Sequence, residues 1–310
     1  MVEARIKKIK GEKLTAVFFI VNPLTAILSR LIIEKFNLNK RNVFIVSFRN
    51  SSLDLLDFES IFIEPRRIDA YRQKILFDSP GARKVLKHLN NSFVLFTPWA
   101  FREANWLIKS KKCKGHFYIE EGQGSYMDYQ TFNYDKIPLI TFIKNNFKNR
   151  VNNGDGNGYF FRDDSSGFIG LHPKCFPKIK SEEKYFLNNT NKIMQFYKPK
   201  TNGIKEIALS CAERRLIDNN WEAMIFKLIE YLPKGGLIKL HPSFYMSQDK
   251  INKIKNYLLI RTNNQVKLCG KEVILEIEML YENKNLYGPQ TTLSFYALFF
   301  GSNFKTIKLP

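Results

Sequence analysis

Short apolar runs that stop at polar or chain-breaking residues alternate with longer stretches of helical periodicity along most of this sequence. Leu14 to Val21 is an apolar run that Asn22-Pro23 ends, and Leu24 to Phe36 then repeats apolar residues at helical spacing. Strands that alternate with helices in this way form a mostly parallel sheet with helices on both faces. The alternation therefore predicts an α/β fold.

The same pattern continues to the end of the chain. The predicted strands are residues 14–21, 43–47, 92–96, 116–119, 206–210, 237–240, 266–268, 285–287 and 304–308. The predicted helices are residues 24–36, 100–110, 221–231, 248–258, 271–281 and 292–300.

The composition changes between residues 152 and 158, where Asn, Gly and Asp dominate and a linker is expected. A chain of 310 residues also suits two domains of about 100–200 residues each better than one. We therefore predict an N-terminal α/β domain at 1–155, an irregular inter-domain section at 156–200 and a C-terminal α/β domain at 201–310. Ligands are expected at the carboxyl ends of the strands, in a cleft between the domains.

The chain is strongly basic, with 49 Lys and Arg residues against 29 Asp and Glu residues and a formal net charge of +20. Nucleic acid, an anionic membrane surface or an acidic substrate would each suit this charge. The basic residues are spread over the whole sequence, which favours a basic enzyme surface over a nucleic-acid reader. A non-catalytic nucleic-acid-binding protein would explain the charge but not the motifs described below.

The four cysteines are far apart and form no CxxC pair, so a zinc site is not expected and reduced thiols are. The apolar run at residues 14–21 is too short to span a membrane, and no other run approaches twenty residues. These features predict a cytoplasmic protein without a metal site. Peripheral contact with the inner face of the cytoplasmic membrane would fit its charge.

The first candidate motif, Glu120-Glu121-Gly122, directly follows a predicted strand. A carboxylate at a strand end can accept a proton from a sugar hydroxyl as a general base, and Gly122 allows a tight turn behind it. Because adjacent side chains of an extended chain alternate in direction, only one of the two carboxylates is expected to point into the site. The alternative is a solvated acidic turn.

Two further motifs follow predicted strands in the C-terminal half. His241-Pro242 could hold an imidazole against a phosphate and protonate a leaving group, although a histidine bonded to the backbone is the alternative. Thr291-Thr292 precedes a predicted helix, whose N-terminus is a natural phosphate site, although ordinary capping would explain it too. His172 does not follow a clean strand, and we interpret it as structural.

These motifs, in this order, resemble those of bacterial GT-B sialyltransferases, which share an acidic pair with glycine, a His-Pro and a hydroxyl pair. Glycosyltransferase family 52, the lipooligosaccharide sialyltransferases related to bacterial polysialyltransferases, is the most similar. Asn22-Pro23-Leu24-Thr25 is similar to that family's opening segment. The sequence departs from the family in having Glu-Glu where Asp is common and Thr-Thr where Ser is common.

The resemblance implies a GT-B fold, in which two Rossmann-like α/β domains face each other across a cleft. It also implies an inverting, metal-independent transfer of sialic acid from CMP-sialic acid, with no cofactor. Glu120 would be the base with Glu121 as the alternative, His241 would be the acid, and the substrate would be bound by Gly122, Pro242, Glu276, Thr291 and Thr292.

The partners implied are a CMP-sugar donor and an acidic or lipid-linked glycan acceptor, such as a lipooligosaccharide or a capsular polysaccharide. Nucleic acid is not expected as a partner, and a homodimer is compatible with the resemblance. Three alternatives stay open: a transferase for another CMP-activated sugar (a different nonulosonic acid or Kdo), the nucleic-acid-binding protein, and an inactive transferase-like protein.

Overall fold

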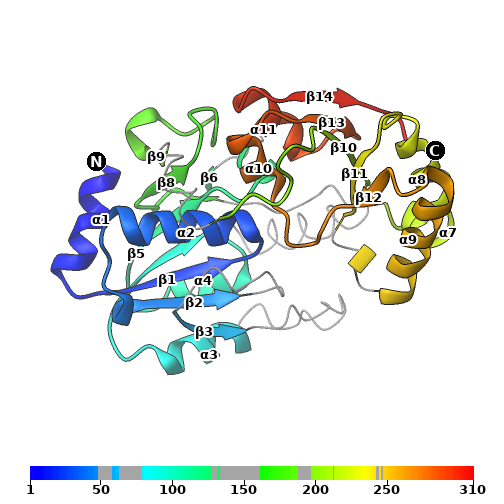
Figure 1. Cartoon of the computed structure of the whole chain (residues 1–310). Coiled ribbons are helices and arrows are strands. Elements are labelled where there is room, and N and C mark those ends of the chain that lie inside the picture. The colour runs from blue at the N-terminus through cyan, green and yellow to red at the C-terminus, as the bar shows by residue number, and fades with distance from the viewer. Residues whose placement is uncertain are drawn as a thin grey trace. The chain divides into compact units, whose positions relative to one another are not determined.

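The chain divides into two compact units, Met1–Asn189 and Thr190–Pro310, each built around its own parallel sheet (Figure 1). The predicted linker at residues 152–158 lies outside the part of the chain that is described. The computed structural model describes residues 1–47, 58–62, 79–126, 131–132, 161–187, 197–211, 213–241, 244–245 and 247–310.

The first unit contains a seven-stranded parallel sheet with the strand order β3-β2-β1-β4-β5-β8-β9. Its strands are β1 Thr15–Ile20, β2 Val43–Ser47, β3 Glu59–Phe62, β4 Phe93–Thr97, β5 Cys113–Ile119, β8 Gly167–Gly170 and β9 Lys184–Phe186. A separate pair is formed by β6 Thr131–Phe132 and β7 Phe161–Arg162. The helices are α1 Val2–Gly11, α2 Pro23–Lys35, α3 Pro80–His88 and α4 Arg102–Ile108, with a 3-10 turn η4 at Gln123–Tyr126.

The central strand β1 is buried on both faces, as its continuous apolar run predicts. Phe19 packs with the apolar residues of α3 and α4 on one face. On the other face Phe18 stacks on Phe96 with ring centroids 4.4 Å apart, and Phe96 stacks on Phe117 at 5.1 Å. This aromatic row joins β1, β4 and β5 and fixes the strands whose carboxyl ends carry the candidate residues.

Two parts of the first unit differ from the sequence-based expectation. Residues predicted as an irregular inter-domain section contribute β8 and β9 to the sheet, because the four residues of β8 are all buried although their apolar run is too short to show a period. The charged N-terminus forms α1, since Val2, Ile6 and Ile9 recur at helical spacing and are buried.

The second unit contains a five-stranded parallel sheet with the order β12-β11-β10-β13-β14. Its strands are β10 Glu206–Leu209, β11 Gly236–Lys239, β12 Val266–Leu268, β13 Asn285–Gly288 and β14 Asn303–Thr306. Its helices are α7 Arg214–Asn219, α8 Trp221–Ile229, α9 Gln248–Thr262, α10 Leu275–Tyr281 and α11 Thr292–Phe299. The α/β alternation predicted from the sequence is confirmed in both units.

In the part of the chain that the structure covers, no helix has both the length and the apolar character needed to cross a bilayer.

Candidate functional site

Each sheet reverses its strand order once, and that reversal locates the expected ligand site. In the first sheet the chain proceeds from β1 outward to β3 and then returns to β4 on the other side of β1. In the second it proceeds from β10 outward to β12 and returns to β13 on the other side of β10. Ligands of doubly wound sheets bind at the carboxyl ends of the strands beside such a reversal. A ligand is therefore expected at the carboxyl ends of β1 and β4 in the first sheet, and of β10 and β13 in the second.

Glu120, the predicted base, is fully buried at the end of β5. One carboxylate oxygen accepts a hydrogen bond from the Tyr126 hydroxyl at 2.6 Å, and the other accepts one from the Leu171 backbone N–H at 2.6 Å. Gly170 lies so close that a Cβ there would stand 3.0 Å from the Glu120 carboxylate. Glu120 therefore ties η4 to the residues after β8, which is a structural task.

The Glu120 carboxylate also influences Cys175, which is completely buried beside it. Burial is the larger cause, and the nearby Glu120 carboxylate a smaller one, of a pKa of the Cys175 thiol well above its usual range. The Cys175 thiol therefore stays protonated and places no second negative charge beside the buried Glu120 carboxylate.

Glu121, the alternative base, is half-buried rather than enclosed. Its backbone carbonyl accepts a hydrogen bond from the Asn22 side-chain amide at 2.6 Å, and the same amide nitrogen lies 3.4 Å from the Glu121 carboxylate. Its backbone N–H donates to the Ser125 hydroxyl at 3.0 Å. Gly122 follows with φ of 124°, a conformation that suits glycine. The turn thus orients Glu121 as the more accessible carboxylate of the pair.

Asn22 places this carboxylate beside the first sheet's reversal point, because Asn22 lies directly after β1 and caps α2. Its Oδ1 accepts the Thr25 N–H at 2.9 Å, while the Thr25 hydroxyl oxygen accepts the Asn22 N–H at 3.2 Å. This reciprocal capping fixes the Asn22 amide in place. The sequence shows Asn22-Pro23 as a strand end, but its contact with Glu121, 99 positions away, is not visible there.

His241 lies at the end of β11 in the second unit and is half-buried. Its backbone N–H donates to the Ser210 hydroxyl at 2.7 Å, and Ser210 directly follows β10. The bond connects the ends of two neighbouring strands at the carboxyl edge. Pro242, predicted with His241, lies outside the described residues. His172 remains in keeping with a structural role, since its Nδ1 accepts the Lys174 backbone N–H at 3.2 Å.

Thr291 is the N-cap of α11, which starts after β13 and so lies beside the reversal point of the second sheet. Its hydroxyl oxygen accepts the Leu293 backbone N–H at 3.2 Å. Thr292 is the first residue of the helix. Gly288, at the end of β13, allows a close approach, since a Cβ there would lie 2.7 Å from the Cβ of Leu209. The first turn of α11 therefore directs its backbone N–H groups to the carboxyl edge.

Glu276 belongs to the first turn of α10, which follows β12. The loop between β12 and α10 is held by Lys239, whose ammonium group donates to the backbone carbonyls of Gly270, Lys271 and Val273 at 2.6, 3.2 and 2.8 Å. Lys239 precedes the His-Pro motif in the sequence, but nothing in the sequence shows its contact with a loop thirty residues away. It is a residue that sequence reasoning missed.

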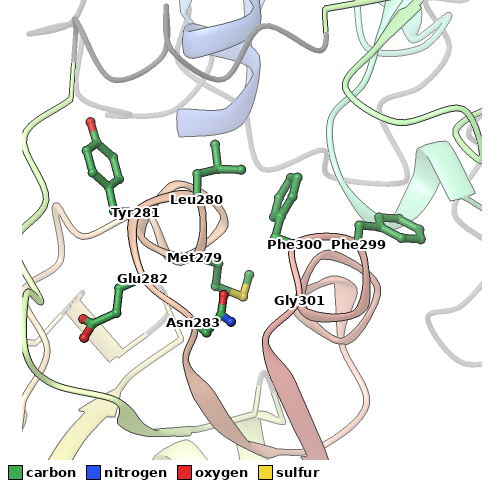
Figure 2. A pocket seen from close by; sticks show the side chains of 8 residues that line it. All are labelled: Met279, Leu280, Tyr281, Glu282, Asn283, Phe299, Phe300 and Gly301. Atoms are coloured by element: carbon green, nitrogen blue, oxygen red, sulfur yellow. The ribbon is translucent and has the colours of Figure 1, made fainter.

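A cavity lies at the other edge of the second sheet. It measures about 650 Å³ and is lined by the ends of α10 and α11 and the residues that lead into β13 and β14, namely Met279, Leu280, Tyr281, Glu282, Asn283, Phe299, Phe300 and Gly301 (Figure 2). Met279 and Asn283 lie between the two helix ends, while Phe299 points away from α10. The cavity contains none of the predicted site residues.

The described residues contain no group of three or more His, Cys, Asp and Glu side chains that could hold a metal ion. Lys239 and the backbone N–H groups of the first turn of α11 supply positive groups at the second carboxyl edge.

Comparison with solved structures identifies the fold. The chain is similar to MnaA of S. aureus in complex with UDP, with a TM-score of 0.54 and 10% identity over 94% of this chain and 78% of that one. It is also similar to a protein from Listeria monocytogenes assigned as a UDP-N-acetylglucosamine 2-epimerase, with a TM-score of 0.52, 10% identity and the same coverage of 94% and 78%. The two Rossmann-like units thus have the predicted GT-B fold. No protein-family model and no curated protein matches the sequence.

These comparisons correct the predicted family, donor and partners. The ligand and substrate that the two structures name are uridine nucleotides, so the assignment to family 52 and to a CMP-sialic-acid-dependent sialyltransferase is wrong. The CMP-sugar donor and the acceptors inferred from the resemblance are therefore wrong as well. The comparisons support neither another CMP-activated sugar nor the nucleic-acid-binding alternative. The prediction failed because acidic turns, His-Pro ends and threonine caps at strand ends belong to doubly wound sheets in general.

Proposed function

We propose that this protein is an enzyme that uses a UDP-sugar, and that it transfers the sugar to an acceptor. The observation that carries the proposal is the start of α11 at the reversal point of the second sheet, in a fold that resembles a UDP complex. Backbone N–H groups at a helix N-terminus bind phosphate, and doubly wound sheets bind nucleotides at this point.

The diphosphate of the UDP-sugar would lie at the first turn of α11, with the Thr291 hydroxyl beside it. The capping bond from Leu293 to Thr291 is 3.2 Å long, and a phosphate oxygen is a stronger acceptor for that N–H group than the neutral hydroxyl. The helix dipole adds attraction for the phosphate charge. No cofactor is needed for this binding, because backbone groups supply the positive end of the interaction.

His241 would act on the same phosphate from the end of β11. It lies two strands from β13, and the Ser210 hydroxyl holds its backbone N–H in place. An imidazole there can donate a proton or a hydrogen bond to the UDP that leaves when the sugar is transferred. Glu276, on the first turn of α10, would contact the ribose hydroxyls.

Glu121 would be the general base of the first unit. Both oxygens of the Glu120 carboxylate already accept hydrogen bonds within a fully buried cluster, whereas Glu121 is half-buried and held by Asn22. A carboxylate fixed in this way can accept the proton of an acceptor hydroxyl as the new glycosidic bond forms. Glu120 would hold the turn that carries Glu121 in place through its bonds to Tyr126 and Leu171.

Epimerisation of UDP-N-acetylglucosamine is a second candidate function, favoured by the likeness to the Listeria protein. Both functions require the diphosphate site on the second unit. They differ in the product, because transfer releases UDP and epimerisation keeps the sugar attached to it.

Binding and product analysis test the proposal in two steps. Isothermal titration in the presence of EDTA should show that UDP binds more tightly than CMP or ADP. Incubation with a panel of UDP-sugars and glycan acceptors should then release UDP in transfer, or convert UDP-N-acetylglucosamine into its 2-epimer without releasing UDP. A protein that binds no uridine nucleotide, or prefers CMP, would contradict the proposed function.

A further inference from the structure

Lys239 makes an unusual set of contacts for a lysine at the end of a strand. The three N–H donors of its ammonium group go to three backbone carbonyls of one loop, those of Gly270, Lys271 and Val273, at 2.6, 3.2 and 2.8 Å. No carboxylate of the described residues lies within ion-pair distance of this ammonium group. Burial lowers the pKa of Lys239, and the interactions with Cys269, Glu276 and Glu272 oppose that effect. The Lys239 side chain is partly buried, and a charge in such surroundings is retained at a cost, which points to a task.

The loop that Lys239 holds, residues 269–274, has no regular secondary structure of its own. Within the loop the Val273 N–H donates to the Gly270 carbonyl at 3.2 Å. From outside, the Tyr245 hydroxyl donates to the Cys269 carbonyl at 3.1 Å, and the Ile274 N–H donates to the Tyr197 hydroxyl at 3.0 Å. A Cβ on Gly270 would lie 2.2 Å from the carboxylate of the exposed Glu272, which would have to move to make room. One backbone bond and several side chains from outside therefore hold the loop, and Lys239 makes three of those side-chain bonds.

The position of the loop suits one end of a nucleoside diphosphate. Loop 269–274 follows β12 at the carboxyl edge, and α11 follows β13 at the same edge, with β11 and β10 between them. Three strand intervals separate the two points, or roughly 14 Å at the usual strand spacing. An extended nucleoside diphosphate has a comparable length. With its diphosphate at α11, its nucleoside reaches the loop that Lys239 holds and the first turn of α10.

We propose that Lys239 is a positioning residue for nucleoside recognition: by holding three carbonyls of loop 269–274, it fixes the backbone that contacts the uridine and sets the start of α10, which carries Glu276. This inference rests on the proposed function and deepens it. Lys239 touches the loop and not the ligand. Its removal should weaken the contacts with uridine while leaving those with the diphosphate intact.

The test compares UDP with inorganic pyrophosphate, which shares the diphosphate but lacks the nucleoside. In the Lys239→Met variant the affinity for UDP should fall at least ten-fold, while the affinity for pyrophosphate should change less than two-fold. Lys239→Arg should not restore UDP binding, because the planar guanidinium group cannot reproduce three converging bonds. The matched control is Lys250→Met, since Lys250 also donates to a carbonyl, that of Ile217 at 2.7 Å, but from α9. It should bind UDP as the unmodified protein does.

A measurement without a variant guards against a Lys239→Met protein that does not fold. Hydrogen exchange of the unmodified protein should show that UDP slows exchange at residues 269–276 and that pyrophosphate does not. If the unmodified protein binds no UDP, the proposed function and this inference both fail. If it binds UDP but the variant binds it equally well, or the loop gains no protection, Lys239 has no role in recognition and the proposed function still stands.

Discussion

The carboxyl edges of the two sheets share one architecture and differ in charge. At each reversal point a helix starts directly after a strand, α2 after β1 with Asn22 as its cap and α11 after β13 with Thr291 as its cap. Beside the first cap lie two carboxylates, those of Glu120 and Glu121. The second carboxyl edge carries Lys239 at the end of β11 and His241 after it, two strands from β13. The first edge thus suits proton acceptance and the second suits anion binding.

The two caps also differ in how completely they are satisfied. Asn22 and Thr25 exchange hydrogen bonds in both directions, and the Thr25 hydroxyl accepts a further one from the Val21 N–H at 3.0 Å. Thr291 accepts a single backbone N–H, that of Leu293, through its side chain. Within each helix, however, the cap side chain accepts one first-turn N–H, that of Thr25 in α2 and that of Leu293 in α11, so the remaining first-turn N–H groups are those that a phosphate would bind.

The largest expected effect is the loss of activity in Glu121→Gln. The substitution keeps the size of the side chain and removes the proton acceptor, so turnover of a UDP-sugar should fall about 10²–10⁴-fold. The free energy of unfolding should change by less than about 1 kcal/mol, because the side chain is half-buried. Steady-state kinetics and urea denaturation measure the two effects. Full activity in a folded variant would remove Glu121 from the mechanism.

In contrast to Glu121→Gln, Glu120→Leu should mainly lower the stability of the protein. It leaves the Tyr126 hydroxyl and the Leu171 N–H without their acceptor in a buried site. Each unpaired group costs about 1–3 kcal/mol, so the free energy of unfolding should fall by about 2–6 kcal/mol. Urea denaturation measures the loss. Glu120→Gln is the control and should be less damaging, because its amide can still accept one of these bonds. A Glu120→Leu protein as stable as the unmodified one would show that Glu120 is not the anchor of the turn.

The alternation of strands and helices was predictable because it depends on local periodicity, and the strands at 43–47 and 266–268 have the predicted bounds. Elements with little local signal were missed: α1 is mostly charged, and β8 has four residues. The strand-end position of the acidic pair was also predictable. Which of its two carboxylates is enclosed was not, because the partners Tyr126 and Leu171 reach Glu120 through the fold.

The class of nucleotide could not be predicted from the sequence for a related reason. His241 and Thr291 occupy strand ends as predicted, but the same residue types suit any nucleotide diphosphate or monophosphate at such a place. Discrimination between bases depends on the shape of a loop such as 269–274. Three hydrogen bonds to that loop come from Lys239, which lies thirty residues before it in the chain, so no motif in the loop itself reveals them.

Two histidines of the first unit, His116 and His172, differ in burial, and pH separates them. His116 lies within β5, is 2% exposed, and its Nε2 has no hydrogen-bond partner among the described residues. Burial lowers the pKa of His116 to about 4, although Asp164 opposes the effect. As the pH falls from 6.5 towards 4, the His116 imidazole therefore binds a proton in the unfolded chain but not in the folded chain.

This difference should cost about 3 kcal/mol of unfolding free energy over that pH range. The loss is measured as the difference between the unmodified protein and His116→Leu in urea denaturation at pH 7, 5.5 and 4, because the variant lacks the titrating group. His172→Leu is the control and should follow the unmodified protein closely, as His172 is only partly buried. Parallel pH profiles for the unmodified protein and His116→Leu would contradict the assignment.

The smallest expected effect tests the reversal-point argument most directly, by comparing two caps within the second unit. Thr291 caps α11 at the reversal point, and Ser247 caps α9 through an equivalent bond to the Lys250 N–H at 3.3 Å. Thr291→Ala and Ser247→Ala should each lower the free energy of unfolding by about 1 kcal/mol. Only Thr291→Ala should also weaken UDP binding, by several-fold in isothermal titration. Of the two helices, only α11 follows a strand beside the reversal point, namely β13. Equal losses of UDP affinity in both variants would mean that the reversal of strand order does not select the binding helix.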